Sequence, residues 1–341
     1  MLLKELTELN GVAGMEKPIR EALIQALEPS GCAWRIDKIG NLITSRNTLS
    51  TAPRVMLSAH MDEVGLMITE IDADGTLKFR TVGVINPRLL VSKAVRLHET
   101  LNGVIGSKAI HLQKPAERKK DFTLEQLYID IGANSKEEAA KQVKVGDYAY
   151  FATAFEPLGT GHYKAKALDD RVGCAILAEI MKKDYGFPLY GVFTVQEEIG
   201  LRGAQVAAYQ VDPAFAVVLE GTAAADLLED EESAWSTEVG QGPACSIIDS
   251  TTLYQPELVQ YVKKIAEKND IPLQFRRGSA GGNDAGKIHL NKSGVPTITL
   301  SVPCRYIHSP VSVMAEQDYR DCIRLTEAIL RELPYAVMNR T

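Results

Sequence analysis

The sequence has few cysteines, no excess of positive charge and no long apolar run. Only five of its 341 residues are cysteine, and no two of them form a Cys-x-x-Cys pair. An odd, scattered set argues against both a disulfide framework and a thiolate zinc site, so we expect buried, unpaired side chains. No apolar stretch approaches the roughly 18 to 20 residues that span a bilayer. The sequence therefore predicts no membrane partner.

Negative charge is in slight excess. The chain has 38 Lys and Arg residues against 44 Asp and Glu residues, which gives a formal net charge of −6. This balance offers no electrostatic reason to expect nucleic acid or an anionic surface as partner. The first residues alternate charged and apolar side chains at helical spacing, without the uninterrupted apolar core of a secretory signal. We therefore expect a cytoplasmic protein that binds no nucleic acid.

The order of predicted helices and strands indicates an α/β fold interrupted by a β-rich segment. Apolar spacing predicts helices near both ends, and near-continuous apolar runs predict buried strands at 54–59, 189–195, 215–219 and 297–301. Between residues 67 and 158 the pattern changes to polar–apolar alternation around Asp74-Gly75 and Asn102-Gly103, which is typical of hairpins. We predict one α/β catalytic domain, 1–66 with 159–341, and a small inserted β domain, 67–158.

Chemically distinctive side chains follow the predicted buried strands. The first strand ends at His60, the second leads to Glu197 and Glu198, the third ends at Glu220, and the last leads to His308. Functional groups of open α/β sheets gather at the carboxyl ends of the strands. Asp169 and Asp170 precede a predicted helix and belong to the same edge. We therefore expect two histidines and several carboxylates to converge there.

This set of side chains favours metal binding over ion pairing. Clustered carboxylates without regular Lys or Arg partners repel one another unless they take up protons or cations. Imidazole nitrogens with carboxylate oxygens suit zinc, cobalt or manganese. Two ions that share one carboxylate would need about five ligands plus a spare acid as base, the inventory of a two-metal hydrolase that activates a bridging water.

Each of these residues alone has a simpler explanation. A histidine at a strand end is usually a hydrogen-bonded structural residue, and a Glu-Glu pair is usually a solvated turn. Asp169-Asp170 alone is most simply a helix cap. Their joint occurrence after buried strands on one edge favours the functional interpretation.

Six segments then make the chain resemble the M42 metallopeptidases, the family of tetrahedral and glutamyl aminopeptidases, over nearly its whole length. The segments, in order, are SAHMDEVG (58–65), KALDDRVGC (166–174), TVQEEIGLRGA (194–204), VVLEGT (217–222), GGNDAGKIH (281–289) and SVPCRYIHSP (301–310). The resemblance implies a metallo-aminopeptidase that removes N-terminal residues from short peptides with a free N-terminus. It implies two divalent ions per subunit, with Zn²⁺ or Co²⁺ favoured and Mn²⁺ acceptable.

The resemblance also assigns roles to individual residues. Asp169 would bridge the two ions, Asp62 would orient the imidazole of His60, and Asp170 would support the site or cap the helix. Glu197 would take a proton from the bridging water and deliver it to the leaving amine. The implied ligands are His60 and Glu220 for the first ion, Glu198 and His308 for the second, and Asp169 for both. Gly282 and Asp284 are candidate contacts of the substrate, and Asp284 or Glu220 could hold its free amine.

The family fold implied here is a phosphopeptidase-like α/β catalytic domain with an inserted small β-rich PDZ-like domain. That insert would mediate dimerisation, and family members commonly build tetrahedral dodecamers. Two positions depart from the family pattern. Asn283 stands where relatives often have Thr, and Glu220 stands where many have Asp, one methylene shorter.

Two other functions remain open at this point. A glycoside hydrolase of the endoglucanase type would use paired carboxylates without metal, which leaves His60, Asp169 and His308 without a purpose. A non-enzymatic assembly protein would be expected to lack a ligand or the base, whereas every expected ligand type is present. Substrate preference also stays open, because Arg202, Arg276, Arg277 or Arg305 could favour acidic N-termini or could be ordinary surface residues.

Overall fold

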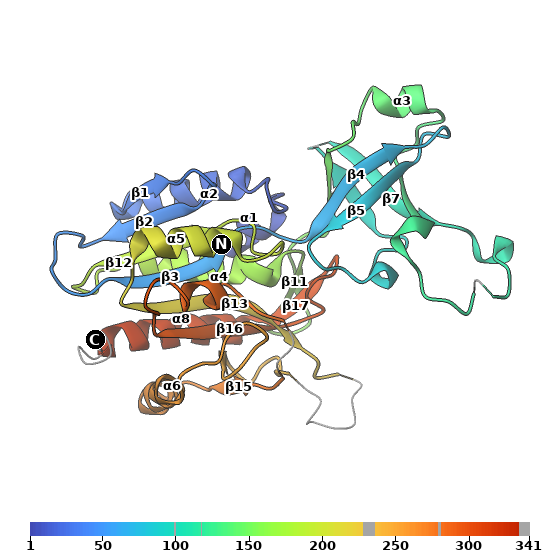
Figure 1. Ribbon diagram of the computed structural model, residues 1–341. Helices are drawn as coiled ribbons and strands as arrows, with labels where there is room; N and C mark the ends of the chain where they lie inside the picture. Colours follow the sequence, from blue (N-terminus) through green and yellow to red (C-terminus); the bar gives the residue numbers. More distant parts are fainter. Residues whose placement is uncertain (99, 117, 228–235, 279–280, 334–341) are drawn as a thin grey trace.

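The computed structural model describes residues 1–98, 100–116, 118–227, 236–278 and 281–333, in a large layered part and a small barrel beside it (Figure 1). The helices are α1 (Leu2–Glu8), α2 (Lys17–Leu27), α3 (Lys136–Ala140), α4 (Leu168–Met181), α5 (Arg202–Val211), α6 (Pro256–Lys268), α7 (Ala285–Ile288) and α8 (Glu316–Glu332), with 3₁₀ turns η1 (Glu28–Ser30), η2 (Pro87–Leu89), η3 (Ile110–Leu112) and η4 (Leu124–Gln126).

The described residues of the layered part form one mixed sheet. Its strand order is β1-β2-β12-β3-β13-β16-β17-β11-β10, and β14 pairs with β15 and β16. The four central strands, β12, β3, β13 and β16, are parallel to one another. The bounds are β1 (Ala33–Ile36), β2 (Leu42–Arg46), β3 (Val55–His60), β10 (Glu156–Leu158), β11 (His162–Ala165), β12 (Leu189–Thr194), β13 (Phe215–Ala224), β14 (Ala244–Ser246), β15 (Gln274–Arg276), β16 (Thr297–Arg305) and β17 (Ser312–Ala315).

Helices cover both faces of this sheet, which is why its central strands are apolar on both sides. On one face α1, α2, α4, α6 and α8 pack against the sheet in one large apolar core, which includes Ile176, Val217 and Leu325. On the other face α5 and α7 close a smaller core around Met56 and Val218. The mixed α/β fold predicted from the sequence is thereby confirmed in its broad class.

The β-rich segment forms a separate closed barrel with its own apolar core. Strand order around the barrel is β4-β5-β8-β7-β6-β9, and β9 pairs back onto β4. The bounds are β4 (Gly65–Ile71), β5 (Leu77–Val82), β6 (Ala94–Leu97), β7 (Leu101–Ser107), β8 (Leu127–Asp130) and β9 (Tyr148–Phe151). The barrel strands therefore run from Gly65 to Phe151. The predicted insert, 67–158, also included β10, which lies in the large sheet.

The hairpin turn predicted at Asn102-Gly103 lies a few residues earlier in the structure. Leu97 pairs with Leu101 at the end of the β6–β7 ladder, so Asn102-Gly103 lies inside β7 rather than at the turn. Gly103 serves close packing instead, because a Cβ there would come within 2.8 Å of Ile129 Cγ2. The Asp74-Gly75 turn, in contrast, joins β4 to β5 as expected.

All five cysteines are free and buried, as the sequence predicted. The described residues contain no helix with both the length and the apolar character needed to cross a bilayer.

A buried ion group joins the N-terminal segment to the chain on either side of the barrel. Glu63, on the connection into β4, accepts hydrogen bonds from Lys166 Nζ at 2.7 and 2.8 Å and from the Gly11 backbone N–H at 3.0 Å. Arg171 lies 3.4 Å from the same carboxylate and donates to the Leu6 carbonyl. Burial lowers the pKa of Lys166 to about 8, although Glu63 acts in the opposite direction. Removing one partner of such a group leaves a buried charge unpaired.

Glu63→Ala is therefore expected to lower the free energy of unfolding by about 3 to 5 kcal/mol. Urea denaturation followed by circular dichroism measures the change. The control is Glu179→Ala, which removes the half-exposed Lys182–Glu179 pair and should change stability by less than about 1 kcal/mol. Equal losses in the two variants would contradict the role of the Glu63 group.

Candidate metal centre

The parallel strands bring the predicted residues to one edge of the sheet. His60 is the last residue of β3, and its neighbour across the ladder is Thr194, the last residue of β12. Val218 of β13 pairs with Ser58 of β3, so Glu220, two residues further, points to the same side as His60. Glu220 does not end its strand as predicted, because β13 continues to Ala224.

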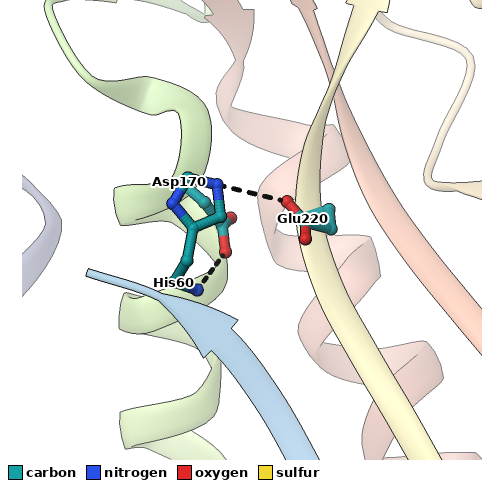
Figure 2. Close-up of side chains that lie close together, drawn as sticks. All are labelled: His60, Asp170 and Glu220. Atoms are coloured by element: carbon teal, nitrogen blue, oxygen red, sulfur yellow. Dashed lines mark hydrogen bonds and ion pairs between the residues drawn. The ribbon is translucent and has the colours of Figure 1, made fainter. Parts of the chain in front are cut away.

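The first group of side chains surrounds His60. Its Nε2 lies 3.4 Å from Asp169 Oδ1 and 3.6 Å from Glu220 Oε2, and the imidazole is almost fully buried. Figure 2 shows the ring facing Glu220, while the Asp170 carboxylate meets the His60 backbone. Three different elements, β3, α4 and β13, thus supply this group.

The second group surrounds His308, in the turn after β16. Its Nε2 lies 3.4 Å from Asp169 Oδ2 and 3.5 Å from Glu198 Oε2. Asp169 therefore faces both histidines, with Oδ1 toward His60 and Oδ2 toward His308. A carboxylate in this position can be shared between two sites.

The separations fit ligands around metal ions better than direct hydrogen bonds. Four ligand atoms placed tetrahedrally at about 2.1 Å from zinc lie about 3.4 Å from one another. The four nitrogen–oxygen distances that join His60 and His308 to Asp169, Glu198 and Glu220 span 3.4 to 3.6 Å. The buried Glu220 Oε1 has no hydrogen-bond partner. Such an orphaned oxygen fits a cation at this position.

The pKa shifts in this cluster of side chains also favour the binding of cations. Burial raises the pKa of Glu198 to about 7, although His308 acts in the opposite direction. Burial, together with Asp170, raises the pKa of Glu220 well above its usual range. Burial acts to lower the pKa of His308, but Asp169 and Glu198 raise it to about 9. Without ions Glu198, Glu220 and His308 thus tend to hold protons, a role that cations at this place would take over.

Asp170 supports the site rather than facing the shared position. Its Oδ2 accepts the His60 backbone N–H at 3.0 Å, and its Oδ1 accepts the Gly173 N–H at 2.9 Å in the first turn of α4. Both oxygens are therefore engaged by backbone donors, as expected for a residue that caps the helix and supports the site.

Asp62 acts through its backbone and its carboxylate in different ways. The contact to His60 Nδ1 comes at 3.0 Å from the Asp62 carbonyl oxygen, whereas the carboxylate is 3.6 Å away. The carboxylate instead accepts the backbone N–H groups of Glu197 at 3.0 Å and Glu198 at 3.1 Å. The imidazole of His60 is thus oriented by the main-chain carbonyl of Asp62 rather than by its carboxylate as predicted. The Asp62 side chain instead holds the Glu197-Glu198 turn.

Glu16 is a supporting residue that the sequence did not indicate. Its Oε1 accepts the Gly14 N–H at 2.7 Å and the Gln196 N–H at 3.2 Å. Two buried carboxylates, Glu16 and Asp62, thereby fix three successive backbone donors at residues 196–198. No local pattern around Glu16 could have revealed this, because its partner lies 180 residues away in the chain.

Glu197 lies beside the first group without belonging to either set of facing ligands. Its Oε2 is 3.9 Å from His60 Nε2 and its side chain is 11% exposed. Burial raises the pKa of Glu197 well above its usual range, although His60 acts in the opposite direction. A partly exposed acid at this place can exchange protons with a molecule in the cavity.

One cavity of about 520 Å³ is lined by the residues of both groups and by Glu197, namely His60, Asp169, Glu197, Glu198, Glu220 and His308. Gly282 and Asn283 form part of its wall, as does Arg276, which is the one predicted specificity arginine that reaches it. Arg305 is held by Asp226 in two hydrogen bonds of 2.7 Å.

Asp284, expected to contact substrate, lies elsewhere. Its side chain is fully buried and accepts hydrogen bonds from Thr194 Oγ1 at 2.6 Å and Ser58 Oγ at 3.3 Å. It is not among the residues that line the cavity, since its carboxylate is bound to β3 and β12 of the sheet. Burial raises the pKa of Asp284 to about 6.

The departure at Asn283 has a structural reason. Its Oδ1 accepts the Ala285 N–H at 2.9 Å, and its Nδ2 donates to Asp249 Oδ2 at 3.2 Å and to the Tyr254 hydroxyl at 3.3 Å. The amide thus supplies both an acceptor and a donor, which a hydroxyl group at one atom could not direct to these separated partners.

Comparison with known proteins agrees with this geometry. A family model described as M42 glutamyl aminopeptidase matches residues 40–325. The chain belongs to the M42 family. The lysyl aminopeptidase of Pyrococcus furiosus is 33% identical, over 97% of this chain and 96% of its own. The predicted family and enzyme class, a hydrolase of the exopeptidase type, are thereby confirmed.

Solved structures of aminopeptidases share the whole fold. The TET aminopeptidase of the marine sediment archaeon Thaumarchaeota archaeon SCGC AB-539-E09 matches with a TM-score of 0.94 at 34% identity, covering 99% of this chain and 98% of its own. The TET1 peptidase of Pyrococcus horikoshii, described as assembling into a tetrahedron or a large octahedral shell, matches with a TM-score of 0.86 at 35% identity, over 97% and 98%.

The shared position of Asp169 leads to a binding prediction for this M42 protein. Metal-stripped wild type should bind two equivalents of Zn²⁺, Co²⁺ or Mn²⁺, and Asp169→Ala should weaken both sites by at least about tenfold, because one carboxylate faces both. Isothermal titration calorimetry measures both numbers. The matched control is Asp74→Ala, an exposed aspartate in the barrel, which should bind as wild type does. Two undiminished sites in Asp169→Ala would refute the sharing.

Proposed function

We propose that this M42 peptidase is a dinuclear metal-dependent aminopeptidase that removes N-terminal residues from short peptides. The observation that carries the proposal is the position of Asp169, whose two oxygens face two separate histidine–carboxylate groups at 3.4 Å. Among the described residues that line the same cavity, Glu197 is the one acid outside those groups.

The residues divide into two ligand sets. His60, Asp169 and Glu220 would hold one ion, and His308, Asp169 and Glu198 the other. Two divalent ions, Zn²⁺ or Co²⁺ with Mn²⁺ as a further option, would supply Lewis acid polarisation of the scissile carbonyl and a nucleophilic water at neutral pH. With its longer side chain, relative to Asp, Glu220 places Oε2 3.6 Å from His60 Nε2.

The proton transfer belongs to Glu197. In this proposal its Oε2 accepts a proton from the attacking water and delivers it to the nitrogen of the leaving amine. The desolvated position of the carboxylate raises its pKa, which suits a group that must both take and give a proton. Asp62 and Glu16 hold the backbone of the Glu197 turn, so the carboxylate keeps its direction during the reaction.

A glycosidase mechanism fits the site less well. Paired acids would act without metal and without imidazoles, whereas Asp169 here lies between two histidines. A chelator distinguishes the two functions, because it would remove peptidase activity and spare a metal-free glycosidase.

A second proposal concerns the barrel and the assembly of the protein. We propose that the barrel, predicted as a PDZ-like insert at 67–158 and observed with strands from Gly65 to Phe151, mediates dimerisation, and that a dodecamer is the full assembly, supported by the assemblies described for the TET1 peptidase. A cytoplasmic location is supported by the five free, buried cysteines, and recovery of the protein with a membrane fraction would count against it.

Glu197→Gln tests the catalytic proposal directly. The variant should retain two metal ions but lose about 10² to 10⁴ in kcat, because the amide cannot accept the proton. The assay is cleavage of unblocked and N-acetylated peptides by metal-loaded protein, and wild type should cleave only the unblocked set. The control Glu238→Gln, which alters a carboxylate outside the described cavity wall, should leave kcat unchanged. Wild-type protein that binds two ions yet cleaves no unblocked peptide would overturn the proposal.

The assembly proposal has its own measurement. Light scattering coupled to size exclusion should give masses at multiples of the 37.3 kDa chain, with dimers and dodecamers populated. Monomer alone across the micromolar range would refute the assembly while leaving the catalytic proposal intact.

A further inference from the structure

The barrel reaches the catalytic cavity through one loop. Residues 83–86 join β5 to η2, and Val84 in this loop lines the same cavity as His60, Glu198 and His308. Among the described residues that line this cavity, Val84 is the one contributed by the barrel. In Figure 1 the barrel stands beside the sheet, with the ends of β4 and β5 turned toward it.

The loop is fixed on both sides of Val84. Gly83 has a φ of +82°, and a Cβ there would meet Val64 Cγ1 at 2.7 Å and Glu198 Oε2 at 3.4 Å, so its backbone lies directly against the metal-facing glutamate. Ile85 is buried in the barrel core, and Asn86 caps η2 by accepting the Arg88 N–H at 3.0 Å. Val84 is therefore held between the barrel core, which includes both Val64 and Ile85, and Glu198 of the layered part.

The Val84 side chain nevertheless remains 74% exposed. A single exposed valine is ordinary on a protein surface, but this one faces a cavity that also presents Leu201 and Ile307. An apolar side chain of a bound peptide would remove this surface from water, which stabilises the complex.

We propose that Val84 is a specificity-determining residue, which the inserted barrel presents so that it contacts the side chain of a residue flanking the scissile bond. The assignment rests on the proposed aminopeptidase function and names a preference within it, for apolar side chains at that position. The barrel then contributes to substrate choice as well as to assembly.

Substitution at Val84 tests this assignment on the metal-loaded, fully assembled enzyme. The substrates are unblocked tripeptides that carry Leu, Ala, Glu or Lys on either side of the scissile bond. Val84→Ala should lower kcat/KM for Leu at one of the two positions by about fivefold to tenfold relative to Ala, because two methyl contacts are lost. Val84→Asp should lower that ratio further, because the carboxylate would lose hydration against an apolar side chain.

The matched control is Val145→Ala, an exposed valine of the barrel outside the described cavity wall, which should leave the Leu-to-Ala ratio unchanged. An unchanged ratio in Val84→Ala, with metal content and assembly as in wild type, would overturn the assignment. An equal change in Val145→Ala would overturn it too, since the effect would then not come from the cavity. Wild type that cleaves no unblocked peptide would instead refute the proposed function, and this assignment with it.

Discussion

Carboxylates buried beside two imidazoles impose the main constraint on this molecule. Burial raises the pKa of Glu197 and Glu220 well above its usual range and that of Glu198 to about 7, so the folded chain tolerates these groups only with protons or cations between them. The sheet provides the rigid frame that holds them there. Its parallel strands end at one edge, and helices on both faces keep water from the strands behind that edge.

A further layer of buried acids keeps this edge in order. Glu16 and Asp62 accept three successive backbone N–H groups of the turn that carries Glu197 and Glu198, and Asp170 accepts that of His60. Each of these carboxylates accepts hydrogen bonds from the main chain, so the positions of His60, Glu197 and Glu198 are fixed through their own backbone. Preorganisation of this kind lowers the cost of reaching a reactive geometry.

The sequence predicted the residues that follow a general rule and missed those that depend on distant partners. His60, Glu197 and Glu220 could be found because buried strands are recognisable from apolar runs and their carboxyl ends meet at one edge. Asp284 carries an equally suggestive motif, yet its carboxylate turns onto Ser58 and Thr194, which no local pattern reveals. The predicted turn at Asn102-Gly103 was wrong for a related reason, because the glycine is needed there for close packing against Ile129. The three-residue strands β14 and β15 were missed because they are too short to show a period.

The point of insertion explains how the barrel and the cavity come to share a wall. β3 ends at His60 and β4 begins at Gly65, so the chain enters the barrel directly from the metal-facing edge. The chain returns through β11 to Lys166, three residues before Asp169. Lys166 Nζ lies 2.7 Å from Glu63 Oε1, so this ion pair joins the segment that leaves the sheet to the segment that returns to it. Any domain inserted between these two connections must lie beside the site. The close approach of Gly83 to Glu198, where an added Cβ would lie 3.4 Å from Oε2, is thus a consequence of topology, and it places the proposed assembly surface and the proposed substrate contact on one small module.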